Sequence, residues 1–134
     1  MTPRRKLIAA GLFSVGLLVS LPLGARPALL GRLEPGQWVV KPYEQGAPQR
    51  SLCVRDPAAL LQLEHGGGCS QEVLAGESDR AIVEYGCGGN RGFGHTSIRL
   101  QTPRSATIDT QGMIDGRPFA YRAVARRSGG CRPG

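Results

Sequence analysis

Apolar and polar residues alternate in short segments along most of the chain, and clusters of glycine, proline and aspartate separate these segments. Alternation with a period of two is typical of β-strands that bury one face. The first such segment is Gln37 to Lys41, which follows the turn residues Pro35 and Gly36, and the second is Arg50 to Val54. The pattern predicts an all-β domain, mainly an antiparallel meander that forms a curved sheet or a small barrel.

One segment departs from the alternation and predicts a single short helix. Asp56 suits the N-cap position, and Pro57 suits the first helical position, where its missing N–H costs nothing. The helix is expected over Ala58 to Glu64, before the consecutive glycines 66–68 end it.

The segments 69–75 and 81–87 form the first predicted hairpin, with a turn around Ser78. Antiparallel pairing about this residue places cysteines and apolar residues on one face. The pairs on that face are Cys69–Cys87, Gln71–Tyr85, Val73–Val83 and Ala75–Ala81. The opposite face sets Glu72 against Glu84, a like-charge pair that opposes this register.

Two further hairpins share the strand 106–111. It pairs with 93–100 on one side, and on the other a turn at Asp115-Gly116, suited to type I′, returns the chain. The predicted pairs are Ile98–Ile108 and Thr96–Thr110 in the first of these hairpins, and Ile108–Ala123, Thr110–Tyr121 and Asp109–Arg122 in the second. The shared strand therefore shows the same inward face to both neighbours.

The N-terminal segment has the composition of an export signal. Basic residues at positions 4–6 precede an apolar run from Leu7 to Leu23, and Ala25 supplies a small residue for cleavage. We expect export to the periplasm, with an uncleaved membrane anchor as the alternative because the apolar run is long. The chain would then divide into a signal peptide (1–25), a short N-terminal extension (26–34) and a single β domain (35–131).

Four cysteines in an exported chain predict a framework of two disulfides. Sequence alone allows three connectivities. The first hairpin favours a bridge between Cys69 and Cys87, because directly opposed residues of an antiparallel pair lie within disulfide reach. Elimination then leaves Cys53 with Cys131, and a bridge from Cys53 to Cys69 across the short helix is the competing arrangement.

The formal net charge is +7, from 17 basic and 10 acidic residues. Cleavage of the signal would remove three basic residues and no acids, which leaves +4. A basic group near the C-terminus could meet acidic lipids or polyanions, although a solvated strand face is the simpler interpretation. Its members are Arg122, Arg126, Arg127 and Arg132. Nucleic acid is not an expected partner, because aromatic residues that could stack on bases are few.

Several motifs follow one another between Leu33 and Cys131. They are Pro35-Gly36-Gln37-Trp38, Leu52-Cys53-Val54, the hairpin from Cys69 to Cys87, and Arg126-Arg127-Ser128-Gly129-Gly130-Cys131. Together they resemble a family of bacterial exported proteins that is classed only as a domain of unknown function. Relatives often read Cys-x-Thr-Pro-Glu where this chain has Cys53-Val54-Arg55-Asp56-Pro57. The resemblance implies a periplasmic location and no established activity.

Residues that could carry chemistry are few. His65 and Cys69 could place two ligands on one metal, but no second close pair accompanies them, so no metal or cofactor is expected. The glycine-rich stretch 86–92 lacks the helix and the Gly-Lys-Ser/Thr ending of a phosphate-binding loop. A thiol nucleophile paired with His65 or His95 would need a free cysteine, and His95 is expected to be solvated on the polar side of its strand.

No catalytic residues are assigned, and the ligand-binding residues stay unknown. The expected function is a non-enzymatic periplasmic module that binds an apolar ligand, a lipid or an envelope protein. Five aromatic residues could line the interior of such a module, although a filled core accounts for them more simply. They are Trp38, Tyr85, Phe93, Phe119 and Tyr121. The alternative is a cell-envelope hydrolase that uses a histidine and a carboxylate.

Overall fold

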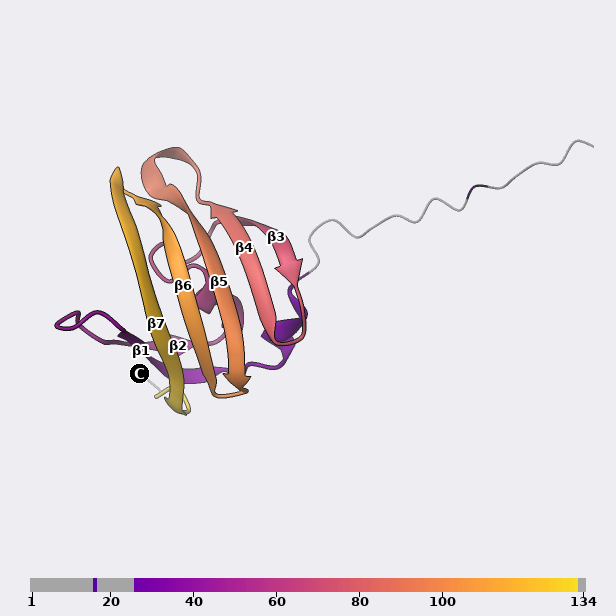
Figure 1. The fold of residues 1–134 in the computed structure, drawn as a ribbon, viewed down its shortest axis with the longest axis vertical. Helices are drawn as coiled ribbons and strands as arrows, with labels where there is room; N and C mark the ends of the chain where they lie inside the picture. The colour runs from indigo at the N-terminus through magenta and orange to yellow at the C-terminus, as the bar shows by residue number, and fades with distance from the viewer. Residues whose placement is uncertain (1–15, 17–25, 133–134) are drawn as a thin grey trace, which may run out of the picture.

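A computed structural model describes residue 16 and residues 26–132, and shows one open antiparallel sheet of seven strands (Figure 1). The strands are β1 (Gly36–Pro42), β2 (Arg50–Val54), β3 (Ser70–Gly76), β4 (Arg80–Gly86), β5 (Gly92–Thr102), β6 (Ser105–Ile114) and β7 (Arg117–Gly129). Their order in the sheet is β2-β1-β7-β6-β5-β4-β3. The all-β prediction is confirmed, with an open sheet as the form it takes. The expected signal peptide lies outside the described residues, apart from Gly16.

The two later hairpins have the predicted register at every predicted pair, and the β5–β6 register shifts only between Leu100 and Thr102, next to its turn. Ile98 pairs with Ile108, which pairs in turn with Ala123, and Asp109 pairs with Arg122. At the turn between β6 and β7, Asp115 and Gly116 have φ angles of 49° and 75°. Positive φ at both central residues is what a type I′ turn requires, so the local turn chemistry accounts for this hairpin.

The first hairpin is right over most of its length and wrong next to its turn. Gln71–Tyr85, Glu72–Glu84 and Val73–Val83 are paired as predicted. The register then shifts between Val73 and Ala75, so that Ala75 pairs with Ile82 and not with Ala81. A bulge places one extra residue on one strand, and simple counting outward from the turn cannot foresee it.

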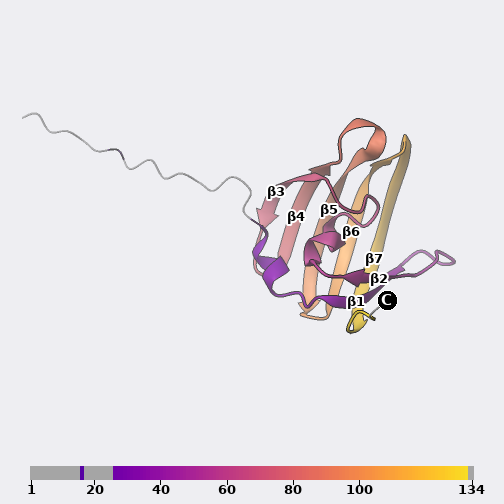
Figure 2. The same cartoon turned by 180° about the vertical axis from the view of Figure 1, so that it is seen from behind.

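The core lies on one face of the sheet, which we call the inner face. Figure 2 looks onto this face: β1 and β2 run across the other strands, and the short coil between β2 and β3 lies in front of the sheet. The largest fully buried side chains are Trp38, Leu29, Leu60, Leu61, Ile98, Ile108, Val40, Val54, Val83 and Thr96. They come from both the strands and the covering segments, so the sheet and its cover share one core.

The expected helix over Ala58 to Glu64 is shorter than predicted. It is a 3₁₀-helix, η2 (Pro57–Leu61), and the Asp56 side chain caps it by accepting a hydrogen bond of 3.0 Å from the Ala58 N–H. The carbonyl of Leu61 accepts a 2.7 Å hydrogen bond from Thr96 Oγ1 on β5. This hydrogen bond holds the end of η2 against β5 on the inner face of the sheet.

The segment expected to be an extension, residues 26–34, contributes directly to the core. It contains the 3₁₀-helix η1 (Ala28–Gly31). Leu29 is fully buried, and Leu30 and Leu33 are each only 4% exposed. The packed unit therefore includes side chains that lie before the Pro35-Gly36 turn. Among the helices of the described segments, none is both long and apolar enough to cross a membrane.

All four cysteines are in disulfides, Cys53–Cys131 and Cys69–Cys87. This is the pairing that the first hairpin favours and that elimination completes. The shorter bridge holds the start of β3 to the end of β4, and the longer one holds β2 to the end of β7. Disulfides of this kind persist in an oxidising, extracellular compartment.

Candidate functional site

A shallow groove of about 860 Å³ crosses the face of the sheet opposite the core, which we call the outer face. It is lined by residues of β3, β4, β5, β6 and β7. Figure 1 looks onto this face, and no described helix covers it there. The groove is open to solvent along its length, because the covering segments all pack on the inner face.

Two rows of outward-facing side chains form the walls of the groove. One row is mainly apolar and consists of Ser70, Gly86, Phe93, Met113 and Pro118. The other row is mainly polar and consists of Glu72, Glu84, His95, Gln111 and Ala120. Each row follows directly paired residues from strand to strand, and the rows are two residues apart along each strand. We call them the apolar wall and the polar wall.

Glycines thin the floor between the two walls. Gly94 and Gly112 lie in the intervening row, which pairs Tyr85 with Gly94 and Gly112 with Phe119. A Cβ added to Gly94 would lie 2.3 Å from the Tyr85 hydroxyl, whereas one added to Gly112 would first meet the Phe93 carbonyl oxygen and would lie 3.0 Å from the Phe119 ring. Gly94 therefore leaves room for an aromatic ring under the groove, and Gly112 allows both the close approach of β5 and the nearby Phe119 ring.

Phe93 is a large apolar side chain of the groove that is exposed. It is 57% exposed and belongs to a small set of large apolar residues that the described chain leaves open, together with Tyr43 and Leu74. On the polar wall, His95 lies 3.4 Å from Glu84, and both side chains are about half exposed. The groove thus joins one open aromatic surface to carboxylate, imidazole and amide groups.

His65 lies on the inner side of this floor and is buried. Its Nε2 lies 2.8 Å from the Met113 carbonyl, and its Nδ1 lies 3.0 Å from the Tyr85 hydroxyl. A carbonyl only accepts, so Nε2 carries a proton and donates it to Met113, while Nδ1 and the Tyr85 hydroxyl share the second hydrogen bond. Burial, with Glu64 nearby, raises the pKa of Tyr85 to about 12, which keeps its hydroxyl a donor at neutral pH.

A second polar cluster bonds the chain after η2 to strands β2 and β7. The Tyr121 hydroxyl on β7 donates to Glu64 at 2.8 Å and accepts from Arg50 on β2 at 2.8 Å. Arg50 and Glu64 also form an ion pair of 2.7 Å. Burial and the Glu64 carboxylate raise the pKa of Tyr121. The hydroxyl is therefore protonated at neutral pH, and the cluster holds β2, β7 and the segment after η2 together.

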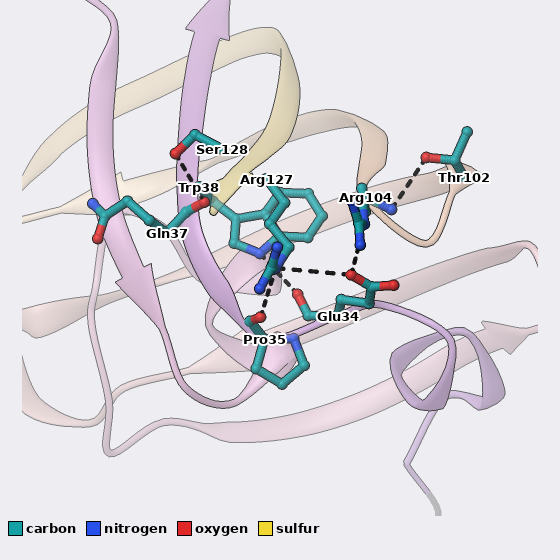
Figure 3. A network of polar contacts seen from close by, with 8 residues as sticks. All are labelled: Glu34, Pro35, Gln37, Trp38, Thr102, Arg104, Arg127 and Ser128. Atoms are coloured by element: carbon teal, nitrogen blue, oxygen red, sulfur yellow. Dashed lines mark hydrogen bonds and ion pairs between the residues drawn. The ribbon is translucent and has the colours of Figure 1, made fainter. Parts of the chain in front are cut away.

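The Pro-Gly-x-Trp motif and the basic C-terminal stretch meet in a third cluster (Figure 3). Arg127 Nε donates to the Pro35 carbonyl at 2.8 Å, and Trp38 Nε1 donates to the Glu34 carbonyl at 3.0 Å. A Cβ on Gly36 would lie 2.4 Å from the Gly129 carbonyl oxygen, so only glycine allows this approach. The residues of the two motifs therefore contact one another where β1 pairs with β7, and their role is to hold these two strands together.

The other residues considered from sequence are bonded to parts of the fold. Cys69 is in a disulfide, and both ring nitrogens of His65 have partners in Tyr85 and Met113. Among the described residues, no group of three or more histidine, cysteine or acidic side chains could hold a metal ion. The stretch 86–92 forms a turn whose Arg91 donates to the carbonyls of His65 and Gly67.

Three of the five aromatic residues considered for an interior lining, Tyr85, Phe93 and Phe119, line the outer groove, with Phe93 on a wall and the inward-pointing Tyr85 and Phe119 at the floor. Trp38 is fully buried in the core and, like Tyr121, is not part of that lining. The groove itself was missed by sequence reasoning. Two signals for it were present: an aromatic residue on the polar side of a strand, and the like-charge pair Glu72–Glu84.

No protein-family model matches this chain, and neither the curated proteins nor the solved structures contain a match.

Proposed function

We propose that this protein is an exported periplasmic binding module that holds its ligand in the outer groove and performs no chemistry on it. The single observation that carries this proposal is the exposed Phe93 ring on one wall of a groove whose opposite wall is polar. Ligand sites commonly combine an apolar surface with a few polar groups that fix orientation. The outer face is available for this role because the inner face is filled by the core.

The periplasmic location is part of the proposal. Two disulfides support an oxidising, extracellular compartment. The basic and apolar composition of residues 1–25 supports export through a cleaved signal. Membership of the exported family with the Pro-Gly-x-Trp start is likewise proposed from the motifs, two of which meet at the junction between β1 and β7.

A ligand survey of the exported protein tests the proposal. The full chain is expressed with export, purified without denaturation and examined by native mass spectrometry alongside Phe93→Ser. We expect a bound species, or binding from a panel of peptides, glycans and lipids, that is lost in Phe93→Ser while the circular dichroism spectrum is unchanged. Retention of the same ligand by Phe93→Ser would place binding elsewhere and overturn the groove as the site.

An envelope hydrolase is the second candidate, and the Glu84–His95 contact of 3.4 Å favours it. A histidine beside a carboxylate can serve as a general base. Turnover of a cell-wall fragment or ester that disappears in His95→Gln would establish this function. Equal turnover by His95→Gln and the unaltered protein would remove it.

A further inference from the structure

We infer that the outer groove holds an extended cationic polypeptide segment, with basic side chains on the polar wall and apolar side chains on the apolar wall. This inference rests on the proposed function and names the class of ligand. Three observations carry it: the sign of the charge in the groove, the like-charge pair at one end, and the shape of the groove.

The charge of the groove is opposite to that of the protein. The chain has 17 basic residues and 10 acidic ones. The groove is lined by Glu72, Glu84 and His95 but by no lysine or arginine. Local potential, and not net charge, selects the ligand at an interface. An acidic ligand would meet two carboxylates with no cation to receive it, whereas a basic ligand finds complementary charge.

The two carboxylates are placed where they repel one another. Glu72 and Glu84 are directly opposed in the β3–β4 pair, and both are exposed. Like charges in this position destabilise a sheet. Within the described part of the chain, no lysine or arginine forms an ion pair with either of them, and the contact of Glu84 is with His95. A ligand cation between the two carboxylates would relieve this repulsion.

The shape of the groove suits an extended chain. Strands lie about 4.8 Å apart, so five strands span about 19 Å, which is the length of five or six extended residues. Successive side chains of an extended segment point in opposite directions. A segment lying along the groove would therefore direct one set of side chains to Glu72 and Glu84 and the alternate set to Phe93 and Met113.

Recognition would depend on side chains and not on an added strand. The backbone groups of β4, β5, β6 and β7 are already paired with neighbouring strands. The segment would cross these strands and contact the walls. This requirement separates an alternating basic and apolar segment from a polyamine, which has no side chains for Phe93, and from an acidic peptide, which the carboxylates repel.

The test uses three capped hexapeptides and the full chain purified after export. The cationic probe is Gly-Lys-Leu-Lys-Leu-Gly; glutamate replaces lysine in the second peptide, and serine replaces leucine in the third. Binding is measured by isothermal titration calorimetry. We expect binding of the cationic probe only, and weaker binding when salt is raised from about 0.01 M to about 0.15 M, since the Debye length falls from about 30 Å to about 8 Å.

Two double variants of equal net charge test whether the groove carboxylates are responsible for binding of the cationic probe. Glu72→Gln with Glu84→Gln should weaken binding of the cationic probe about tenfold, as the loss of two exposed ion pairs predicts. The matched control, Glu44→Gln with Glu77→Gln, removes the same charge outside the groove lining and should bind as the unaltered protein does. Phe93→Ser should also weaken binding, and circular dichroism verifies that each variant is folded.

The outcomes separate the inference from the proposed function. If Phe93→Ser abolishes binding but the glutamine pair does not alter it, the groove is the site and the cationic ligand class is wrong. If the acidic or the serine peptide binds as well as the cationic probe, the inference is overturned in the same way. If no peptide binds while a glycan or lipid is held through Phe93, the proposed function stands and the polypeptide is excluded. If no variant changes binding, both fail.

Discussion

The inner and outer faces of this sheet share one backbone but differ in how their side chains are used. Tyr85 and Phe119 point inward over Gly94 and Gly112, where their rings fill the space that the missing side chains leave. Phe93 points outward and is 57% exposed. An aromatic ring thus stabilises the protein on one face, and on the other it is available to a ligand. The role of an aromatic residue in this sheet therefore follows from the face it occupies more than from its type.

The largest expected effect contrasts one aromatic residue from each face. Trp38 is fully buried, so Trp38→Ala should lower the free energy of unfolding by about 3–5 kcal/mol. Phe93→Ala removes a mostly exposed ring and should change it by no more than about 0.5 kcal/mol. Urea unfolding followed by circular dichroism measures both. A large loss in Phe93→Ala would mean that the outer face contributes to the core, and the contrast between the faces would fail.

A smaller effect is expected at the floor of the groove, where the two faces are closest. Gly94→Ala places a methyl group 2.3 Å from the Tyr85 hydroxyl and displaces the ring from His65. Overpacking of this kind costs about 1–3 kcal/mol. Gly86→Ala is the control, because Gly86 has nothing within 4 Å of an added Cβ. Thermal unfolding should give a clearly lower melting temperature for Gly94→Ala than for Gly86→Ala. Equal melting temperatures would show that the floor of the groove can accommodate an added methyl group.

Much of this fold can be predicted from sequence because its signals are local. Alternation and the turn at Asp115-Gly116 define the later hairpins without knowledge of the rest of the chain. The packing of Leu29 could not be found this way, because it depends on which segments lie over the inner face. The bulge before Ala75 was missed because an extra residue on one strand interrupts the counting of pairs from the turn. The groove depends on how three neighbouring rows of residues combine, because the row that contains Gly94 and Gly112 lies between the two outward rows that form the walls. Alternation along a single strand does not predict this combination.

The 3₁₀-helix η2 covers the inner face, and its cap gives the molecule a pH-dependent component. The hydrogen bond from Arg26, together with the Ala58 N–H, lowers the pKa of Asp56 from 3.8 to about 2. A carboxyl group with a lowered pKa stabilises the folded state at pH values above its ordinary pKa of 3.8. This stabilisation is lost as the pH falls through about 2. The pair is exposed, so we expect less than about 1 kcal/mol.

Asp56→Asn isolates this component, because asparagine is an equally good N-cap but carries no charge. Its urea midpoint should lie slightly below that of the unaltered protein at neutral pH. The difference between the two proteins should shrink as pH approaches 2. A constant difference across that range would show that the carboxylate does not stabilise the cap through its charge.

The smallest expected effect is a gain in stability on the outer face. Glu72 and Glu84 are directly opposed on neighbouring strands, so Glu72→Lys replaces a repulsion by an attraction and should add about 0.2–1 kcal/mol to the free energy of unfolding. The same change places a cation where the proposed ligand needs a carboxylate, so binding of the cationic probe should fall. A gain in stability together with a loss of binding is expected when an unfavourable pair of like charges is kept because it binds a ligand. Glu77→Lys, at the turn beyond the groove, removes the contact with Arg80 instead and should give neither the gain in stability nor the loss of binding. If Glu72→Lys raises stability and leaves binding intact, the paired carboxylates are unrelated to the ligand.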